Sequence, residues 1–311
     1  MQRQTRAGQR RGERHNKKLP QEALIHSPTS PRAHPQLILC GWDEVAIWGL
    51  DGTSGGVKDK LWSWRGRGRD DIPTEFHDRF DTTAECKPAE DGRKLLITSS
   101  GGAVAVVDRR QDKVVFHARA ANAHSAEILP NNRLAVAASH SPDGTGDRLF
   151  VFDLARPDHQ VLSTELPWGH GVVWDALRHR LWALSTEDIR CYALEQWSSQ
   201  TPQLARIAVI GLPERDGHDL YPVPGTRFLS VSTRTRCWHF CRDTMEFMPH
   251  PLLAEAVGVK SICQHPNTGQ VVYIQGTQDH WWSERVHFLD PDKTMHVPGE
   301  HFYKARWSAP G

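Results

Sequence analysis

The chain has 311 residues, a formal net charge of +1 and six cysteines, and 38% of its residues are hydrophobic. A chain of this length can bury one large core if its fold is all-β or repetitive. No apolar run reaches the length of a transmembrane helix or forms the core of a signal peptide, so neither segment type nor a membrane partner is expected. No two cysteines form a C-x-x-C pair, which favours free, buried thiols and a cytoplasmic location.

Positive charge is concentrated at the start of the chain. Residues 1–34 hold eight Lys or Arg and two Glu, so this segment carries +6 and the remainder −5. It lacks the apolar residues that a folded segment needs, and we expect residues 1–35 to be a disordered basic leader, or to lie upstream of the true start codon. No aromatic residue is interleaved with these charges, so no nucleic-acid partner is expected.

From residue 36 onward the chain consists of short apolar runs separated by Gly, Asp, Asn and Pro, which is typical of an all-β fold. The runs repeat, and five lead segments align with one another: TAECKPAEDGRKLLITSS, AHSAEILPNNRLAVAAS, GHGVVWDALRHRLWALS, GHDLYPVPGTRFLSVS and VKSICQHPNTGQVVYIQG. Two more strand patterns follow each lead segment. A unit of four strands therefore recurs about every 40–48 residues, as in the blades of a β-propeller.

A sixth blade is divided between the two ends of the repeat region. QLILCG, EVAIWGLDG and KLWSWRG, within residues 37–66, supply its three outer strands, and HFYKARW at 301–307 matches the lead strands. Pairing of this C-terminal strand with the N-terminal blade closes the ring and removes the open sheet edges. We therefore predict an all-β domain over residues 36–311, a six-bladed β-propeller.

Each lead segment begins with an ionisable residue. The alignment places six of them at equivalent positions, 39 to 48 residues apart: Glu85, His124, His170, His218, Lys260 and Lys304. The lead strand of a propeller blade lines the central channel, so these side chains are expected to meet around one axis. Because a water-filled channel is polar in any propeller, a purely structural role is the alternative.

These residue types suit acid–base chemistry or metal coordination. We expect His124, His170 and His218 to act as catalytic bases, or to hold Mn, Fe or Zn together with Glu85. No nucleotide cofactor is expected, since the GTSGG segment at 52–56 lacks the Lys-Ser/Thr of a phosphate-binding loop.

Two further groups are candidates for substrate binding. Lys260, Lys304 and Arg306 are expected to bind an acidic group. The loop QGTQDHWWSER at 275–285 carries Trp281 and Trp282, which we expect to form a stacking platform for a sugar ring. The alternative is that one of these tryptophans packs between blades.

The motifs CGWDEV, TSSGG, NAHSAEILP, HGVVWD, GHDL, VKS and the WW pair, over residues 37–307, resemble a bacterial family of uncharacterised β-propeller proteins. That resemblance implies a fold and no activity. More distantly, the three-His channel is similar to that of oligogalacturonate lyase, a propeller enzyme that holds a Mn-type cation with His and Gln. The propeller polysaccharide lyases have seven blades and their motifs do not match this chain residue by residue, so no catalytic assignment carries over.

Taken together, these patterns favour a monomeric, lyase-type enzyme. We expect it to act on an anionic small molecule or a uronate-containing saccharide by proton abstraction or β-elimination, with or without a metal. One alternative is a non-catalytic propeller that binds a protein or a glycan. Another is an enzyme of secondary metabolism that catalyses a cyclisation or rearrangement.

Overall fold

The computed structural model describes residues 35–51 and 57–308. The predicted basic leader, residues 1–35, lies outside this range apart from its last residue, and so does the GTSGG segment at 52–56. Within the described residues, no helix combines the length and apolar composition that crossing a lipid bilayer would require.

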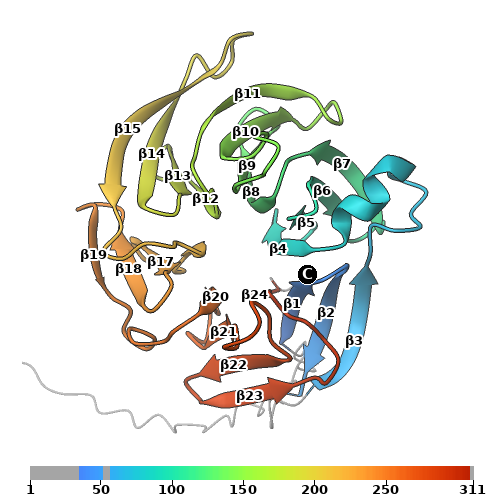
Figure 1. Cartoon of the computed structure of the whole chain (residues 1–311), viewed down its shortest axis with the longest axis vertical. Coiled ribbons are helices and arrows are strands. Elements are labelled where there is room, and N and C mark those ends of the chain that lie inside the picture. Colours follow the sequence, from blue (N-terminus) through green and yellow to red (C-terminus); the bar gives the residue numbers. More distant parts are fainter. Residues whose placement is uncertain (1–34, 52–56, 309–311) are drawn as a thin grey trace, which may run out of the picture. The chain divides into compact units, whose positions relative to one another are not determined.

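In the described part of the chain, six antiparallel sheets of four strands each surround a central axis, as predicted for a six-bladed propeller (Figure 1). The blade nearest the start of the chain contains β1 (Gln36–Gly41), β2 (Glu44–Leu50), β3 (Val57–Trp64) and the last strand, β24 (Lys304–Trp307). The second contains β4 (Thr83–Ala89), β5 (Lys94–Ser99), β6 (Ala103–Asp108) and β7 (Lys113–Arg119). The third contains β8 (Ala123–Leu129), β9 (Arg133–Ala138), β10 (Arg148–Asp153) and β11 (Gln160–Glu165).

The remaining three blades follow the same order, from the axis outward. The fourth contains β12 (Gly171–Asp175), β13 (Arg180–Leu184), β14 (Asp188–Glu195) and β15 (Gln203–Gly211). The fifth contains β16 (Asp219–Pro222), β17 (Phe228–Ser232), β18 (Cys237–Cys241) and β19 (Glu246–Pro249). The sixth contains β20 (Val259–Gln264), β21 (Val271–Gln275), β22 (Arg285–Leu289) and β23 (Lys293–His296).

The ring is closed as the sequence predicts. β24 pairs antiparallel with β1, so that Leu37 lies opposite Trp307 and Cys40 opposite Lys304. The blade nearest the start of the chain therefore takes its innermost strand from residues 304–307 and its three outer strands from residues 36–64. This pairing covers the edge of β1 that would otherwise be open.

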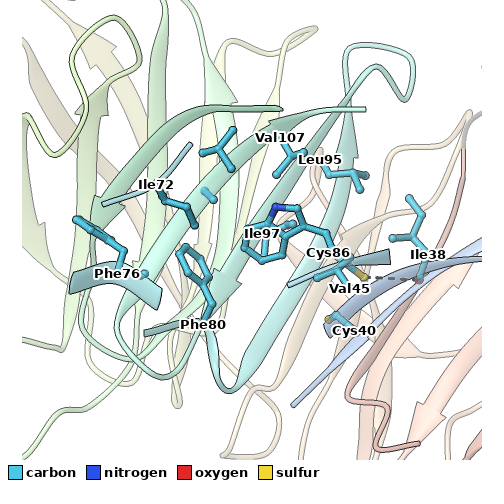
Figure 2. Packing of buried hydrophobic residues seen from close by; sticks show 14 of the residues in the cluster. Ile38, Cys40, Val45, Ile72, Phe76, Phe80, Cys86, Leu95, Ile97 and Val107 are labelled. Atoms are coloured by element: carbon cyan, nitrogen blue, oxygen red, sulfur yellow. Dashed lines mark hydrogen bonds between the residues drawn. The ribbon is translucent and has the colours of Figure 1, made fainter. Parts of the chain in front are cut away.

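The core consists of apolar layers between neighbouring blades. Strand β6 reads AVAVVD, and all five residues from Ala103 to Val107 are buried because adjacent blades cover both faces of the strand. One layer joins Ile38 and Val45 of the first blade to Leu95 and Ile97 of the second (Figure 2). Packing of this kind in every interface holds the lead strands in fixed positions around the axis.

A short 3-10 helix, η1 (Thr74–Phe80), connects the first two blades and was not predicted from the sequence. Its Phe76 and Phe80 are buried in the same apolar layer (Figure 2). Seven residues are too few to leave a readable helical period. The six cysteines are all free and buried, which confirms the expectation for the thiols: Cys40, Cys86, Cys191, Cys237, Cys241 and Cys263.

Candidate active site

The innermost strands are β4, β8, β12, β16, β20 and β24 (Figure 1), and a β-bulge interrupts the register at the start of β4, β8 and β20. In front of β12, β16 and β24, the N–H of His170, His218 or Tyr303 donates to the carbonyl of the residue that pairs with the first residue of the strand. At each of these points two consecutive residues face a single residue of the neighbouring strand. In β8, Ala123 pairs with Ala138 and Ser125 with Ala137, so His124 is the extra residue of a β-bulge. A bulge re-aims side chains, and here it lets two successive side chains face the channel.

The backbone pairing corrects the sequence alignment by one residue in two blades. Lys304 pairs with Cys40, whose carbonyl also accepts from the N–H of Tyr303, so Tyr303 and not Lys304 is the equivalent of His124. In β4 the register shifts between Thr83 and Glu85, so Ala84 is the extra residue. Ala84, and not Glu85, is therefore the equivalent of His124. We call the extra residues the first tier: Ala84, His124, His170, His218, Lys260 and Tyr303. We call the residues that follow them the second tier: Glu85, Ser125, Gly171, Asp219, Ser261 and Lys304.

Buried charged residues of the second tier form an ionic network with Arg306 across the channel. Glu85, Asp219, Lys304 and Arg306 are each at most 1% exposed. Arg306 donates to both carboxylate oxygens of Glu85, at 3.0 and 3.1 Å, and to both of Asp219, at 3.0 and 2.7 Å. Lys304 Nζ donates to Asp219 Oδ1 at 2.9 Å. Two buried carboxylates therefore compensate two buried cations.

The groups of this ionic network favour their charged forms. Burial alone would raise the pKa of Glu85 and of Asp219, but the charges of Arg306 and Lys304 outweigh it and both pKa values are lowered. Burial alone would lower the pKa of Lys304, yet Asp219 and Glu85 raise it. All of these groups stay charged at neutral pH. The network is consequently a structural plug rather than a reactive centre.

A third ion pair lies deeper in the channel. Lys87 Nζ donates to the carbonyl of Val172 at 2.7 Å and to Glu127 at 3.3 Å. The Arg306 guanidinium lies 4.1 Å from the centroid of the Tyr221 ring, a cation–π contact. Below the first tier, the channel is filled by compensated charges and an aromatic ring.

Three of the residues expected at the site are therefore not available at the channel end. Glu85, Lys304 and Arg306 are fully buried and paired with one another or with Asp219, so they expose no atom to a ligand. The repeat alignment grouped them with the histidines because it assumed regular alternation of side chains along each strand, and a bulge interrupts that alternation. The residues brought together at the channel end are the first-tier ones.

The first-tier histidines form a chain of touching rings. The ring centroids of His124 and His170 are 4.3 Å apart, and those of His170 and His218 are 5.3 Å apart. Burial lowers the pKa of His170 to about 4, and burial, followed by the neighbouring positive charges, lowers those of His124 and His218 well below the usual value. All three imidazoles are therefore neutral at pH 7.

Hydrogen bonds select the tautomer of two of these rings. Asn122 donates its amide N–H to the carbonyl of His140 at 2.6 Å, so its Oδ1 accepts from His124 Nε2–H at 2.9 Å. The free Nδ1 of His124 faces the hydroxyl of Tyr303 at 3.5 Å. His170 donates Nδ1–H to the carbonyl of Trp168 at 2.8 Å, which leaves its Nε2 unprotonated. The site thus presents imidazole lone pairs of defined direction.

Lys260 is the cation of the first tier. Its Nζ lies 3.1 Å from His218 Nε2 and donates to that lone pair. Burial lowers the pKa of Lys260 to about 8, an effect that Asp216 opposes and Arg234 adds to. Burial raises the pKa of Tyr303 to about 12, so its hydroxyl stays protonated. A lysine that can exchange its proton near neutral pH thus lines the same pocket as a neutral proton donor.

These side chains line one pocket of about 320 Å³. His124, His218, Lys260, Tyr303 and Trp281 belong to its wall, which is completed by Thr83, Ala84, Ser100 and Asn122. Pockets of this size hold small molecules. Two of these lining residues, Tyr303 and Asn122, were not expected at the site. Aligning the repeats on the first-tier positions identifies Tyr303, and Asn122 lies two residues before the first-tier His124.

The two adjacent tryptophans of the 275–285 loop have different surroundings. Trp281 lines the pocket, is 41% exposed and meets the Tyr303 ring edge-on at 5.2 Å. Trp282 stacks on His280 at 4.5 Å and contacts His301 at 3.9 Å, away from the pocket wall. The loop therefore offers one tryptophan to a ligand, and the other supports the loop.

The expected metal site has no geometric support from its four residues. Both oxygens of Glu85 are bound by Arg306. In the described ranges, no group of three or more His, Cys, Asp or Glu side chains is arranged so that it could hold a metal ion. In addition, the ammonium of Lys260 occupies the lone pair of His218. The three imidazoles and Glu85 as placed do not fit a divalent cation.

The protein is a six-bladed β-propeller, and ionisable side chains from its innermost strands line a pocket. The chain belongs to the family of unknown function DUF6528, which matches residues 51–310. This is consistent with the resemblance to an uncharacterised propeller family. No curated protein sequence matches the chain.

Three solved structures are similar in fold at low sequence identity. They are a chain of the mitotic checkpoint complex (11% identity, TM-score 0.52, covering 87% of this chain and 84% of that one), a chain of a nidogen/laminin complex (10%, 0.58, 88% and 98%), and a putative 6-phosphogluconolactonase from Bacteroides uniformis (13%, 0.56, 88% and 84%). At these identities the likeness concerns the propeller fold alone. None of the three is a polysaccharide lyase, so the distant resemblance to that class stays a prediction.

Proposed function

We propose that the protein is an enzyme that removes a proton from carbon in a small anionic molecule, a uronate-containing saccharide being the class to test first. The proposal rests on one observation: neutral imidazoles, Lys260 and Tyr303 from separate blades converge on a single pocket of about 320 Å³. Ionisable groups with perturbed pKa values that meet in a pocket favour a catalytic site.

Lys260 is the best-matched base in this pocket. A general base is most effective when its pKa lies near the working pH, and burial brings the pKa of Lys260 to about 8. The imidazoles, with pKa values well below neutral, are weaker bases. His218 accepts a hydrogen bond from the Lys260 ammonium and so orients it. The histidines expected as bases then act mainly as positioning residues.

β-Elimination is the reaction that this pair of groups suits. The Lys260 amine takes the proton beside the carboxylate, and the electron pair of that C–H bond forms a double bond to the next carbon. The bond from this carbon to the leaving oxygen breaks, and Tyr303, still protonated because its pKa is about 12, donates a proton to that oxygen. The products are an unsaturated uronate and an alcohol, and no redox partner is needed.

A non-catalytic propeller that binds a protein or glycan is the alternative. The fold does not decide between them, because similar propellers include chains of two protein complexes as well as a putative lactonase. A binding surface would not need a lysine whose pKa is shifted by burial and whose ammonium lies against a neutral imidazole. This difference in chemistry supports the enzyme.

The test is turnover of oligogalacturonides, followed by the ultraviolet absorbance of the new double bond. We expect wild-type protein to release unsaturated product and Lys260→Met to lose activity by a factor of about 10²–10⁴. Arg110→Gln, in the turn between β6 and β7 and outside the pocket wall, is a charge control and should keep activity.

Melting temperatures separate a chemical role from a structural one. Lys260→Met should melt close to wild type, because the buried ionic plug does not include this residue. Wild-type protein that turns over no uronate, or a Lys260→Met variant as active as wild type, contradicts the proposed reaction.

A further inference from the structure

A second pocket adjoins the central one between the second and third blades. It has a volume of about 630 Å³, and Ser100 and Asn122 line both pockets. Its other walls include Arg79 from η1, Arg119 from the end of β7, and the 140–145 segment between β9 and β10. A ligand seated beside Lys260 can therefore extend past Asn122 into this side pocket.

Arg79 is the unusual group of the side pocket. Its Nε is buried and has no hydrogen-bond partner, and no ion pair joins its guanidinium to any residue in the described ranges. The turn at Gly101 and Gly102 brings it close: a Cβ at Gly101 would lie 2.6 Å from the Arg79 carbonyl, and one at Gly102 only 3.3 Å from Nη1. The buried Nε–H without a partner costs free energy that a hydrogen-bond acceptor on a ligand would recover.

The other charges around this pocket are already engaged. Arg119 is paired with Asp158 at 2.5 Å. Asp143 accepts from the Ser141 hydroxyl at 2.6 Å and from the Thr145 hydroxyl at 2.7 Å, which ties it into its own loop. His140 is bound to Asp147 at 2.8 Å. Arg79 is left as the cation that a ligand can use.

The central pocket offers an anionic substrate no fixed positive charge. Lys304 and Arg306, expected from the sequence to bind an acidic group, are buried against Asp219 and Glu85. Lys260 must give up its own charge to act as a base. A second anionic group of the substrate can therefore pair with a fixed cation only outside the first tier.

We propose that Arg79 and the side pocket bind a second carboxylate of the substrate, carried by the sugar next to the one whose reacting carbon lies beside Lys260. This inference rests on the proposed function and names the part of the site that recognises the anion. It implies a substrate larger than the central pocket, with an anionic group on the side of Asn122. Asn122 links the two parts, because it contacts both the His140 loop and the His124 ring.

Binding measured by calorimetry tests the proposal without relying on turnover. The probes are digalacturonic acid and its dimethyl ester, which has the same shape without the charge. Wild-type protein should bind the acid at least about tenfold more tightly than the ester, as expected for a charge-assisted hydrogen bond. Arg79→Gln should remove that preference while leaving ester binding unchanged, and Arg110→Gln should keep it.

Equal losses for acid and ester in Arg79→Gln, or no loss for either, would overturn the anion site. If Arg79→Gln does not fold, the salt dependence of the wild-type protein decides: the preference for the acid should shrink as ionic strength rises. An unchanged preference contradicts the proposal. Arg79-dependent binding without any turnover would leave the anion site standing and remove the proposed reaction, whereas turnover that is insensitive to Arg79 would do the reverse.

Discussion

Arg306 holds both carboxylate oxygens of Glu85, at 3.0 and 3.1 Å, across 221 positions of sequence. This contact joins the last strand of the ring to the second blade at the centre of the channel. It shows that the most strongly ionic part of the channel is a structural element. The pocket proposed as the active site is lined instead by first-tier residues.

Removing Glu85 should destabilise the protein rather than only inactivate it. Glu85→Ala leaves three buried groups, Arg306, Lys304 and Asp219, with excess positive charge. Loss of one partner of a buried ion pair costs about 3–5 kcal/mol. Urea unfolding should show this loss, with the exposed Glu75→Ala as control. A Glu85→Ala variant of wild-type stability that has lost activity would instead indicate a catalytic carboxylate.

Stability should fall in mild acid because the first-tier histidines are buried in neutral form. The pKa of His170 is lowered from 6.5 to about 4, so the unfolded chain binds more protons between these pH values. The stabilising contribution is complete above pH 6.5 and is lost as the pH falls toward 4, by about 3 kcal/mol for this residue. Calorimetric melting as a function of pH checks this. The His170→Gln variant should show a shallower decline; an identical profile contradicts it.

The rate should rise with pH around the pKa of Lys260. The base is the neutral amine, so kcat/KM increases as the pH approaches about 8 and levels off above it. A pH–rate profile at constant ionic strength measures the midpoint. If an imidazole were the base, the rise would be complete well below neutral pH, and Lys260 would have another role.

The two tryptophans of the 275–285 loop should respond differently to substitution. Trp281→Ala removes an exposed ring from the pocket wall and should weaken saccharide binding about tenfold. Trp282→Ala is the matched control: it removes contacts with His280 and His301, so it should lower the melting temperature more than the affinity. A larger binding loss for Trp282→Ala would reverse this assignment.

Ring closure should be essential. A chain ending at Gly299 lacks β24, which exposes the edge of β1 and leaves Glu85 and Asp219 buried without Lys304 and Arg306. We expect this chain not to fold, as measured by circular dichroism and gel filtration. A chain ending at Ser308 keeps every strand and is the control. A folded, monomeric product of the shorter chain would contradict the role of β24.

The blade count and the closure could be read from the sequence because both leave local signs. Each lead strand carries the same order of polar and apolar residues, and HFYKARW at 301–307 repeats that order far from its partners. The grouping of His124, His170 and His218 follows from the same repeat. Arg79 left no such sign, because it lies in η1, which occurs between two blades and has no repeated counterpart.

The sequence by itself determined a six-bladed ring, its closing strand and the convergence of three histidines, since repeated strands must stack in the same way. Only the tertiary structure decided which polar residues reach a ligand. At the start of β4, β8 and β20 a bulge breaks the alternation of side chains, and the residue in front of β12, β16 and β24 takes the equivalent place, so of two neighbours one belongs to the first tier and the other to the second. Charge compensation then distinguishes the two lysines. Lys304 forms an ion pair with Asp219, whereas Lys260 is hydrogen-bonded to the neutral imidazole of His218.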